Sequence, residues 1–225
     1  MSKNEIEVHI ESGKKKVFTC AVEWPGWVRS AQTESAAVEN FLAYAPRYSA
    51  VLNRSSLIFN PSADVKIIER IEGNATTDFG APNMATRHDA DPITPADLDR
   101  FKTIMSACWA VFEQTVRDAT GYELQKGPRG GGRNLDQIVN HVFEAEKLYL
   151  ARINRGFVKV VGEPPVDALR RIQAESLEAL TSAVENGLPE KGSRGSQIWL
   201  PRTYVHRSAW HVLDHVWEIE DKVQK

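Results

Sequence analysis

Apolar and polar residues alternate between residues 5 and 22, the pattern of β-strands with one buried face. A Ser12-Gly13 turn divides this stretch, so we expect a hairpin. The following Trp24-Pro25-Gly26-Trp27 predicts a tight reversal, because proline fixes one backbone angle and glycine accepts the next. A short third strand should begin at Trp27-Val28.

A helical periodicity replaces this alternation after Thr33, which is a suitable residue to cap a helix. Apolar residues then recur at steps of three and four as far as Leu52, and Pro46 should kink or split the helix. Residues 64–71 have the pattern of one more strand. The sequence therefore predicts a small β-β-β-α-β domain over residues 1–72.

The second part of the chain is predicted to be helical. Residues 73–93 are rich in Gly, Asn, Thr, Asp and Pro, so we interpret them as a linker. From residue 94 to the end, four amphipathic stretches predict a four-helix bundle over residues 94–225, with one short strand between residues 197 and 200. We expect the first helix from Thr94 to about Asp118, the second to begin at the cap residues Asn134 and Gln137, the third from Pro164-Pro165 to Asn186-Gly187, and the fourth over about 202–223. The predicted fold class is α+β.

Composition and charge narrow the function classes. The 225 residues are 42% hydrophobic and 26% charged, as in ordinary globular proteins, and the formal net charge is only -2. A general nucleic-acid binder would carry a basic excess, so no nucleic-acid partner is expected. No apolar stretch is long enough to cross a bilayer, and the first residues lack a secretory apolar segment, so we expect a cytoplasmic protein without a membrane partner.

Cysteine and histidine usage defines which metal sites are feasible. Cys20 and Cys108 are far apart in the sequence, so neither a disulfide framework nor a thiolate zinc site is expected. His211 and His215 lie one turn apart on the last predicted helix and can face one ion, and His141 on the second helix offers a third ligand. The alternatives are a solvated polar face for the pair and simple packing for His141.

Carboxylates accompany these histidines. Asp214 and Glu218 share the polar side of the last helix, where they would orient the rings or hold a proton. Glu146 falls within the apolar arc of the second helix, where a carboxylate requires a partner or a cation, although a surface position is an equal alternative.

A basic, glycine-rich stretch, KGPRGGGR, spans residues 126–133 ahead of the second helix. Its Lys126, Arg129 and Arg133 could meet an anion at the helix N-terminus, but no phosphate-binding loop signature follows. A flexible linker is the favoured interpretation.

Three segments together resemble a known metalloprotein superfamily. NHVFEAEKLYL on the second helix, AWHVLDHVWEIED on the last and the four-helix layout resemble the DinB/YfiT-like superfamily over residues 94–223. The resemblance implies that His141, His211 and His215 bind a divalent metal. VEWPGWVRSAQTESAAVENFLAYA, with the hairpin before it, is similar to a HicB-like domain, although the DNA-binding segment that usually follows is replaced here by the helices.

Three imidazole ligands leave coordination positions open, as in catalytic rather than structural sites. The DinB resemblance implies a metal-dependent transferase or hydrolase that acts on a small-molecule substrate, with a low-molecular-weight thiol as a candidate co-substrate and a homodimer as a candidate assembly. The metal would be Zn, Ni, Mn or Fe, which imidazole ligands do not distinguish. Glu146 and Glu218 would move protons, and Arg207 would hold a substrate carboxylate. The alternative is a non-enzymatic ligand-binding or protein-interaction module in which the metal is structural or absent.

Overall fold

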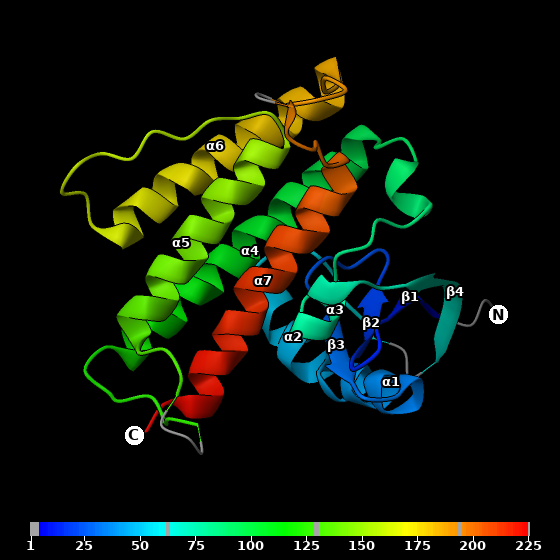
Figure 1. The fold of residues 1–225 in the computed structure, drawn as a ribbon, viewed down its shortest axis with the longest axis horizontal. Coiled ribbons are helices and arrows are strands. Elements are labelled where there is room, and N and C mark those ends of the chain that lie inside the picture. The colour runs from blue at the N-terminus through cyan, green and yellow to red at the C-terminus, as the bar shows by residue number, and fades with distance from the viewer. Residues whose placement is uncertain (1–4, 62–63, 128–130, 193–194, 225) are drawn as a thin grey trace. The chain divides into compact units, whose positions relative to one another are not determined.

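The computed structural model describes residues 5–61, 64–127, 131–192 and 195–224, and it has an α+β fold. A four-stranded mixed sheet forms near the N-terminus and is followed by helices (Figure 1). By the clustering of its contacts the chain divides into two compact units, residues 1–107 with 205–210, and residues 108–204 with 211–225. Within the described residues no helix is long and apolar enough to cross a membrane.

The predicted hairpin and the two further strands are confirmed, and they form one sheet. The strands are β1 (Ile6–Ser12), β2 (Val17–Ala21), β3 (Val28–Ala31) and β4 (Val65–Glu72). Their order is β3-β2-β1-β4, with β2 antiparallel to both of its neighbours and β4 parallel to β1. The register of the parallel pair shifts between Val8 and His9.

The reversal at Trp24-Pro25-Gly26-Trp27 is also confirmed, and it explains the core of the first unit. The backbone N–H of Trp27 donates to the carbonyl oxygen of Trp24 at 3.1 Å, and Gly26 has φ 94°, which favours glycine. The turn places the Trp27 ring against Phe41, with ring centroids 4.0 Å apart and almost parallel. The Trp27 indole N–H donates to the Phe41 carbonyl oxygen at 2.9 Å, so this buried ring is both packed and hydrogen-bonded.

Pro46 splits the first helical stretch, as predicted. Helix α1 (Glu34–Ala43) begins at Thr33, whose hydroxyl accepts from the N–H of Ala36, and α2 (Ala45–Leu52) follows with proline in its first turn. Tyr48 on α2 is fully buried, and its hydroxyl donates to the carbonyl oxygen of Pro25 at 2.8 Å. Helix α1 packs against β2 and β3 and covers one face of the sheet.

A buried carboxylate on β1 holds the segment that follows β4. Residues 73–93, interpreted as a linker, contain helix α3 (Ala75–Phe79) and a 3-10 turn (His88–Ala90). Glu11 is fully buried and accepts hydrogen bonds from the Thr77 hydroxyl at 2.5 Å and from the backbone N–H groups of Asn83 and Met84 at 2.9 and 3.0 Å. These donors compensate the desolvation of the carboxylate and fix this stretch against β1.

The four long helices begin and end close to the predicted residues. They are α4 (Pro95–Ala119), α5 (Leu135–Arg152), α6 (Pro165–Asn186) and α7 (Pro201–Lys222). Asn134 and Gln137 form the predicted capping box at the start of α5. The strand predicted between residues 197 and 200 is wrong, because this stretch forms no sheet and leads directly into α7.

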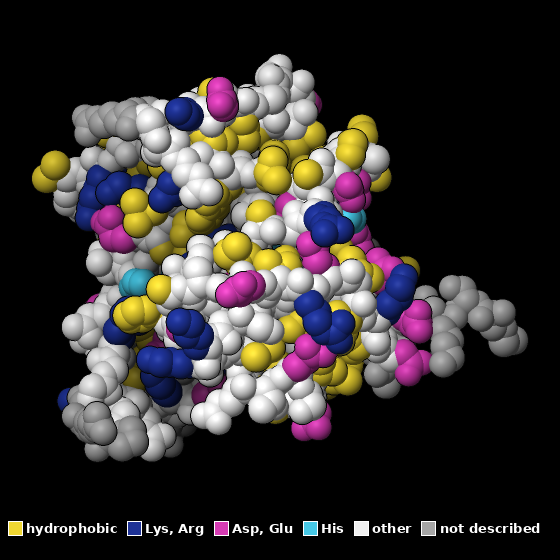
Figure 2. Space-filling view, turned by 45° about the vertical axis from the view of Figure 1, so that its right-hand side comes forward, with side chains coloured by type: hydrophobic (Ala, Val, Ile, Leu, Met, Phe, Trp, Pro, Cys, Tyr) yellow, Lys and Arg dark blue, Asp and Glu magenta, His cyan; other side chains and the backbone are white. Residues whose placement is uncertain are grey.

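In the second unit, α5 packs against α6 (Figure 1). Basic and acidic side chains are interspersed over the face drawn in Figure 2. Among the described residues many charged side chains form ion pairs, such as Arg171 with Glu163 at 2.6 Å and Arg155 with Glu175 at 2.8 Å. This mixture agrees with the nearly neutral composition.

Candidate metal centre

Helices α5 and α7 bring three histidines together in the second unit. His141 comes from α5, and His211 and His215 come from successive turns of α7. One ring nitrogen of each lies within 4.8 Å of the others, and the Nε2 atoms of His141 and His211 are 3.2 Å apart. The ring centroids are 4.7 to 5.1 Å apart in all three pairs.

The histidine pair on α7 is not a solvated face. His211 and His215 are each only 6% exposed, although the helical periodicity placed them opposite the apolar arc. His141 is half-buried. Imidazoles that converge from two helices and are largely withdrawn from solvent differ from two histidines that face water by chance, so the surface alternative is wrong for this pair.

A carboxylate determines which nitrogen of His215 faces the cluster. The Nδ1 atom of His215 lies 2.8 Å from Oε2 of Glu218, and Lys222 donates to the other carboxylate oxygen at 2.6 Å. The hydrogen bond from His215, followed by that from Lys222, lowers the pKa of Glu218 to about 2 against the opposing effect of burial. Because an ionised carboxylate only accepts, the Nδ1 atom of His215 donates this hydrogen bond, and Nε2 is the ring nitrogen left for a ligand.

The His141 ring, on α5, is held in its neutral form. The pKa of His141 is lowered to about 4, mainly by burial and also by the nearby His215 and Arg133, whereas Glu218 opposes them. A metal ligand must be unprotonated, so at neutral pH no proton has to leave this ring before it can bind an ion.

The spacing of the His141 and His211 nitrogens suits a single ion. Imidazole nitrogens bind first-row divalent metals at about 2.0–2.1 Å, so two ligands at tetrahedral or octahedral angles are about 2.8–3.4 Å apart. The 3.2 Å separation of the His141 and His211 nitrogens falls in this range. It also equals the length of a hydrogen bond between one protonated and one unprotonated ring, and metal analysis distinguishes the two arrangements.

The other predicted site residues lie in different surroundings. Glu146 is buried, as its position in the apolar arc indicated, and its Oε2 accepts from the Trp109 indole N–H at 3.3 Å. Cys108 is a buried free thiol, and burial together with the neighbouring Glu146 raises its pKa. Asp214 is half-buried on α7, one residue before His215. The proton-transfer role of Glu146 stays a prediction.

Arg207 makes its contacts in the first unit. Its guanidinium donates to the carbonyl oxygen of Pro82 and lies over the ring of Trp210, with its central carbon 4.9 Å from the centroid. These contacts account for a structural role, and its binding of a substrate carboxylate stays a prediction. In the basic stretch of residues 126–133, interpreted as a flexible linker with an anion site as the alternative, Arg129 lies outside the described residues.

Three residues that extend from the histidines were not identified from the sequence. The Tyr149 ring on α5 lies edge-on to His211 with centroids 5.6 Å apart. Trp199 contacts Tyr149, and Arg152 contacts Trp199. Tyr149 and Arg152 follow His141 by eight and eleven residues, spacings that return to one side of a helix, so the sequence contained a signal for them. Trp199 lies in a connecting segment and has no such signal.

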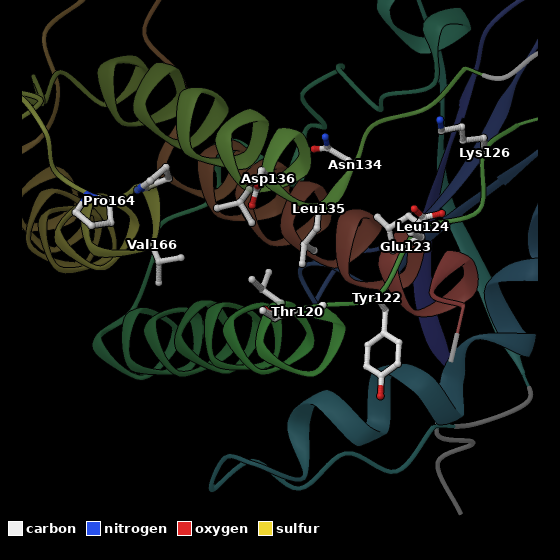
Figure 3. A pocket seen from close by; sticks show the side chains of 14 residues that line it. Thr120, Tyr122, Glu123, Leu124, Lys126, Asn134, Leu135, Asp136, Pro164 and Val166 are labelled. Carbon is white, nitrogen blue, oxygen red and sulfur yellow. Dashed lines mark hydrogen bonds between the residues drawn. The ribbon is translucent and has the colours of Figure 1, made fainter.

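A separate groove lies at one end of the second unit. It has a volume of about 780 Å³ and is lined by the end of α4, the segment after it, and the starts of α5 and α6. In Figure 3, Thr120, Leu135, Asp136, Pro164 and Val166 surround the space, whereas the Tyr122 ring points away. None of the three histidines lines this groove, so it is distinct from the candidate metal centre.

Comparisons with protein-family models, with curated proteins and with solved structures find no match to this chain. Function is therefore inferred from the site itself.

Proposed function

We propose that residues 94–223 form a DinB-like four-helix bundle in which His141, His211 and His215 bind a divalent metal, and that the protein is a metal-dependent transferase or hydrolase. The convergence of three ring nitrogens within 4.8 Å, two of them from buried histidines, carries the proposal. On the same basis we propose that residues 1–72 are a HicB-like domain; the four-stranded sheet with α1 packed on it supports this.

The donor set fits a borderline metal such as zinc, because all three ligands are imidazoles and none is a charged oxygen. A divalent ion in such a site supplies Lewis acidity, which lowers the pKa of a bound water or thiol toward neutrality. Zn, Ni, Mn and Fe all remain candidates, and a low-molecular-weight thiol is the proposed co-substrate.

The surrounding residues would orient the ligands. Glu218 accepts from the Nδ1 atom of His215 and directs its Nε2 atom to the cluster, and Lys222 holds Glu218 in place. Because both oxygens of Glu218 already accept hydrogen bonds, its proposed role is to position His215 rather than to transfer a proton. Glu146, buried beside Trp109, is the remaining proton-transfer candidate.

Metal analysis tests the ligand assignment. Purified protein is stripped with a chelator, reloaded with Zn²⁺, Ni²⁺, Mn²⁺ or Fe²⁺, desalted and measured by mass spectrometry of the elements. We expect stoichiometric metal in the natural chain and its loss in His141→Ala and His211→Ala. His88→Ala is the matched control, because His88 is a half-buried histidine that contacts Glu23 and Asp91 and lies outside the cluster. Metal retained in both cluster variants would refute the assignment.

An activity screen then separates an enzyme from a binding module. The metal-loaded protein is incubated with glutathione, bacillithiol and mycothiol, each paired with electrophiles such as 1-chloro-2,4-dinitrobenzene, and with hydrolysable esters. The proposal expects turnover that is lost in His211→Ala. A metal-loaded protein that turns over none of the panel would support the non-enzymatic alternative.

A further inference from the structure

Two aromatic side chains continue from the histidine cluster in the second unit. The Tyr149 ring stands edge-on to His211, and the Trp199 ring lies 5.3 Å from Tyr149 with 38° between their planes. Both side chains are half-buried, so part of each ring is open to solvent. The backbone N–H of Trp199 donates to the carbonyl oxygen of Arg152 at 2.8 Å, which fixes this part of the connecting segment to the end of α5.

A guanidinium group lies at the far side of these rings. The central carbon of Arg152 is 5.7 Å from the Trp199 ring centroid, and one of its N–H groups donates to the carbonyl oxygen of Gln197 at 3.2 Å. Within the part of the chain that the structure describes, no carboxylate pairs with Arg152. Its neighbour Arg155, by contrast, contacts both Glu175 and Glu178. Arg152 therefore retains donors and an unneutralised charge.

These side chains form a strip that extends from the histidine cluster, with Tyr149 and Arg152 on α5 and Trp199 in the segment before α7. His141, Tyr149 and Arg152 are eight and eleven residues apart, so they lie on the same side of the helix. At 1.5 Å per residue the strip is about 16 Å long. Ala145, between His141 and Tyr149 on this side of the helix, is a small residue.

The chemistry of the strip is specific to one class of ligand. Partly exposed tyrosine and tryptophan rings bind flat conjugated groups by offset or edge-to-face stacking. An arginine with free donors binds a carboxylate through paired hydrogen bonds, and Arg133 contributes further positive charge, since it lowers the pKa of His141. Both features favour a ligand that is aromatic and anionic.

We propose that Tyr149, Trp199 and Arg152 bind the substrate of the metal centre and that this substrate is a flat aromatic carboxylate. The inference rests on the proposed function, because it identifies the substrate class of that same centre. The aromatic group lies against Trp199 and Tyr149, the carboxylate binds Arg152, and the end of the molecule nearest His211 faces the metal.

Calorimetric titration of the zinc-loaded full chain tests this assignment with three probes. 2-Naphthoate has both features, 2-naphthylmethanol keeps the ring system without the charge, and decalin-2-carboxylate keeps the charge without the aromatic rings. We expect 2-naphthoate to bind at least about tenfold more tightly than the neutral alcohol, since a charge-assisted hydrogen-bond pair is lost. We expect it to bind about fivefold more tightly than the saturated acid, since stacking is lost.

Variants assign these preferences to residues. Arg152→Gln should weaken the binding of 2-naphthoate about tenfold and leave the binding of 2-naphthylmethanol unchanged. Arg155→Gln, the matched control, should change the affinity for neither probe. Trp199→Leu should weaken the binding of 2-naphthoate about fivefold and leave the binding of decalin-2-carboxylate unchanged. Trp199→Phe, which keeps an aromatic ring, should retain most of the affinity for 2-naphthoate. A variant that changes all three probes equally would indicate an altered fold and would count against the assignment of that residue.

Zinc affinity is measured separately in every variant by competition with a chromogenic chelator. Zinc binding without selective binding of 2-naphthoate would overturn this inference but would not refute the proposed metal centre. Absence of zinc binding would overturn the metal centre and this inference with it. Selective binding that is lost in Arg152→Gln and Trp199→Leu at unchanged zinc affinity would establish the substrate class.

Discussion

Replacing Glu218 by Gln should weaken metal binding without unfolding the protein. The carboxylate accepts from the Nδ1 atom of His215 at 2.8 Å and is held by Lys222, so it fixes both the tautomer and the orientation of that ring. Glutamine has the same shape, but it is uncharged and only its carbonyl oxygen can accept, so it cannot accept from His215 and Lys222 through two separate atoms as the carboxylate does. The ring then keeps at most a weaker, neutral partner to hold its Nε2 atom toward the other two histidines.

The size of the effect follows from known ligand-orienting interactions. Loss of a hydrogen-bonded carboxylate behind a metal ligand costs about 10- to 100-fold in affinity, or about 1.4–2.7 kcal/mol. Lys222→Met should have a smaller effect, about threefold, because it removes only the residue that holds Glu218. Glu220→Gln is the matched control, since Glu220 is an exposed carboxylate two residues further along the same helix.

The assay is a zinc competition titration with a chromogenic chelator at neutral pH, accompanied by circular dichroism and thermal melting of each metal-free variant. The expected order of zinc affinity is natural chain and Glu220→Gln, then Lys222→Met, then Glu218→Gln. A dissociation constant for Glu218→Gln within twofold of the natural value, in a folded variant, would refute the idea that Glu218 orients the ligand.

Three further predictions concern stability, and urea denaturation measures each. Glu11→Gln should lower the free energy of unfolding by about 2–3 kcal/mol, because an amide NH₂ group would face N–H donors whose hydrogen bonds the buried carboxylate accepts. Glu7→Gln on the same strand removes only an exposed ion pair with Lys66 and should lower the free energy of unfolding by less than about 1 kcal/mol. A result for Glu11→Gln as small as that for Glu7→Gln would contradict this. Burial, and secondarily His206, lowers the pKa of the buried His9 to about 4, so the unfolded chain binds a proton first as the pH falls. The contribution of neutral His9 to the free energy of unfolding should be fully present above about pH 6.5 and should fall by up to about 3 kcal/mol by pH 4. This part of the pH dependence should disappear in His9→Asn, and an unchanged slope would exclude His9 as its source. Tyr48→Phe should cost about 1 kcal/mol through the lost hydrogen bond to Pro25, and an unchanged midpoint would show that this bond contributes nothing net.

Local patterns predicted most of the secondary structure because each element is specified within a few residues. The Thr33 cap, the Pro46 break and the Asn134 capping box all appear at the predicted positions. The strand expected between residues 197 and 200 is absent, because the conformation of this segment is not specified by its local sequence. Its alternating residues fit a strand, but Trp199 bonds to the end of α5 instead of pairing in a sheet, and only the tertiary contacts specify that.

The candidate site was predictable in its ligands and less so in its surroundings. The spacing of His211 and His215 and the position of His141 near an apolar stripe were enough to suggest that they meet, and the structure brings them together. Their burial could not be read from α7, because Asp214 and Glu218 on the same side indicate a solvated face. Trp199 was missed since a connecting segment has no periodicity from which a neighbour can be inferred.

The histidines of α5 and α7 are 70 residues apart in the chain. An ion that joins them closes a long loop containing all of α6, and only the folded chain presents the three rings together. Each tenfold excess of free metal over its dissociation constant would then add about 1.4 kcal/mol to the resistance of the protein to unfolding. The abundance of such a protein in a cell would rise and fall with the supply of its metal, because proteases remove the unfolded chain and spare the loaded one.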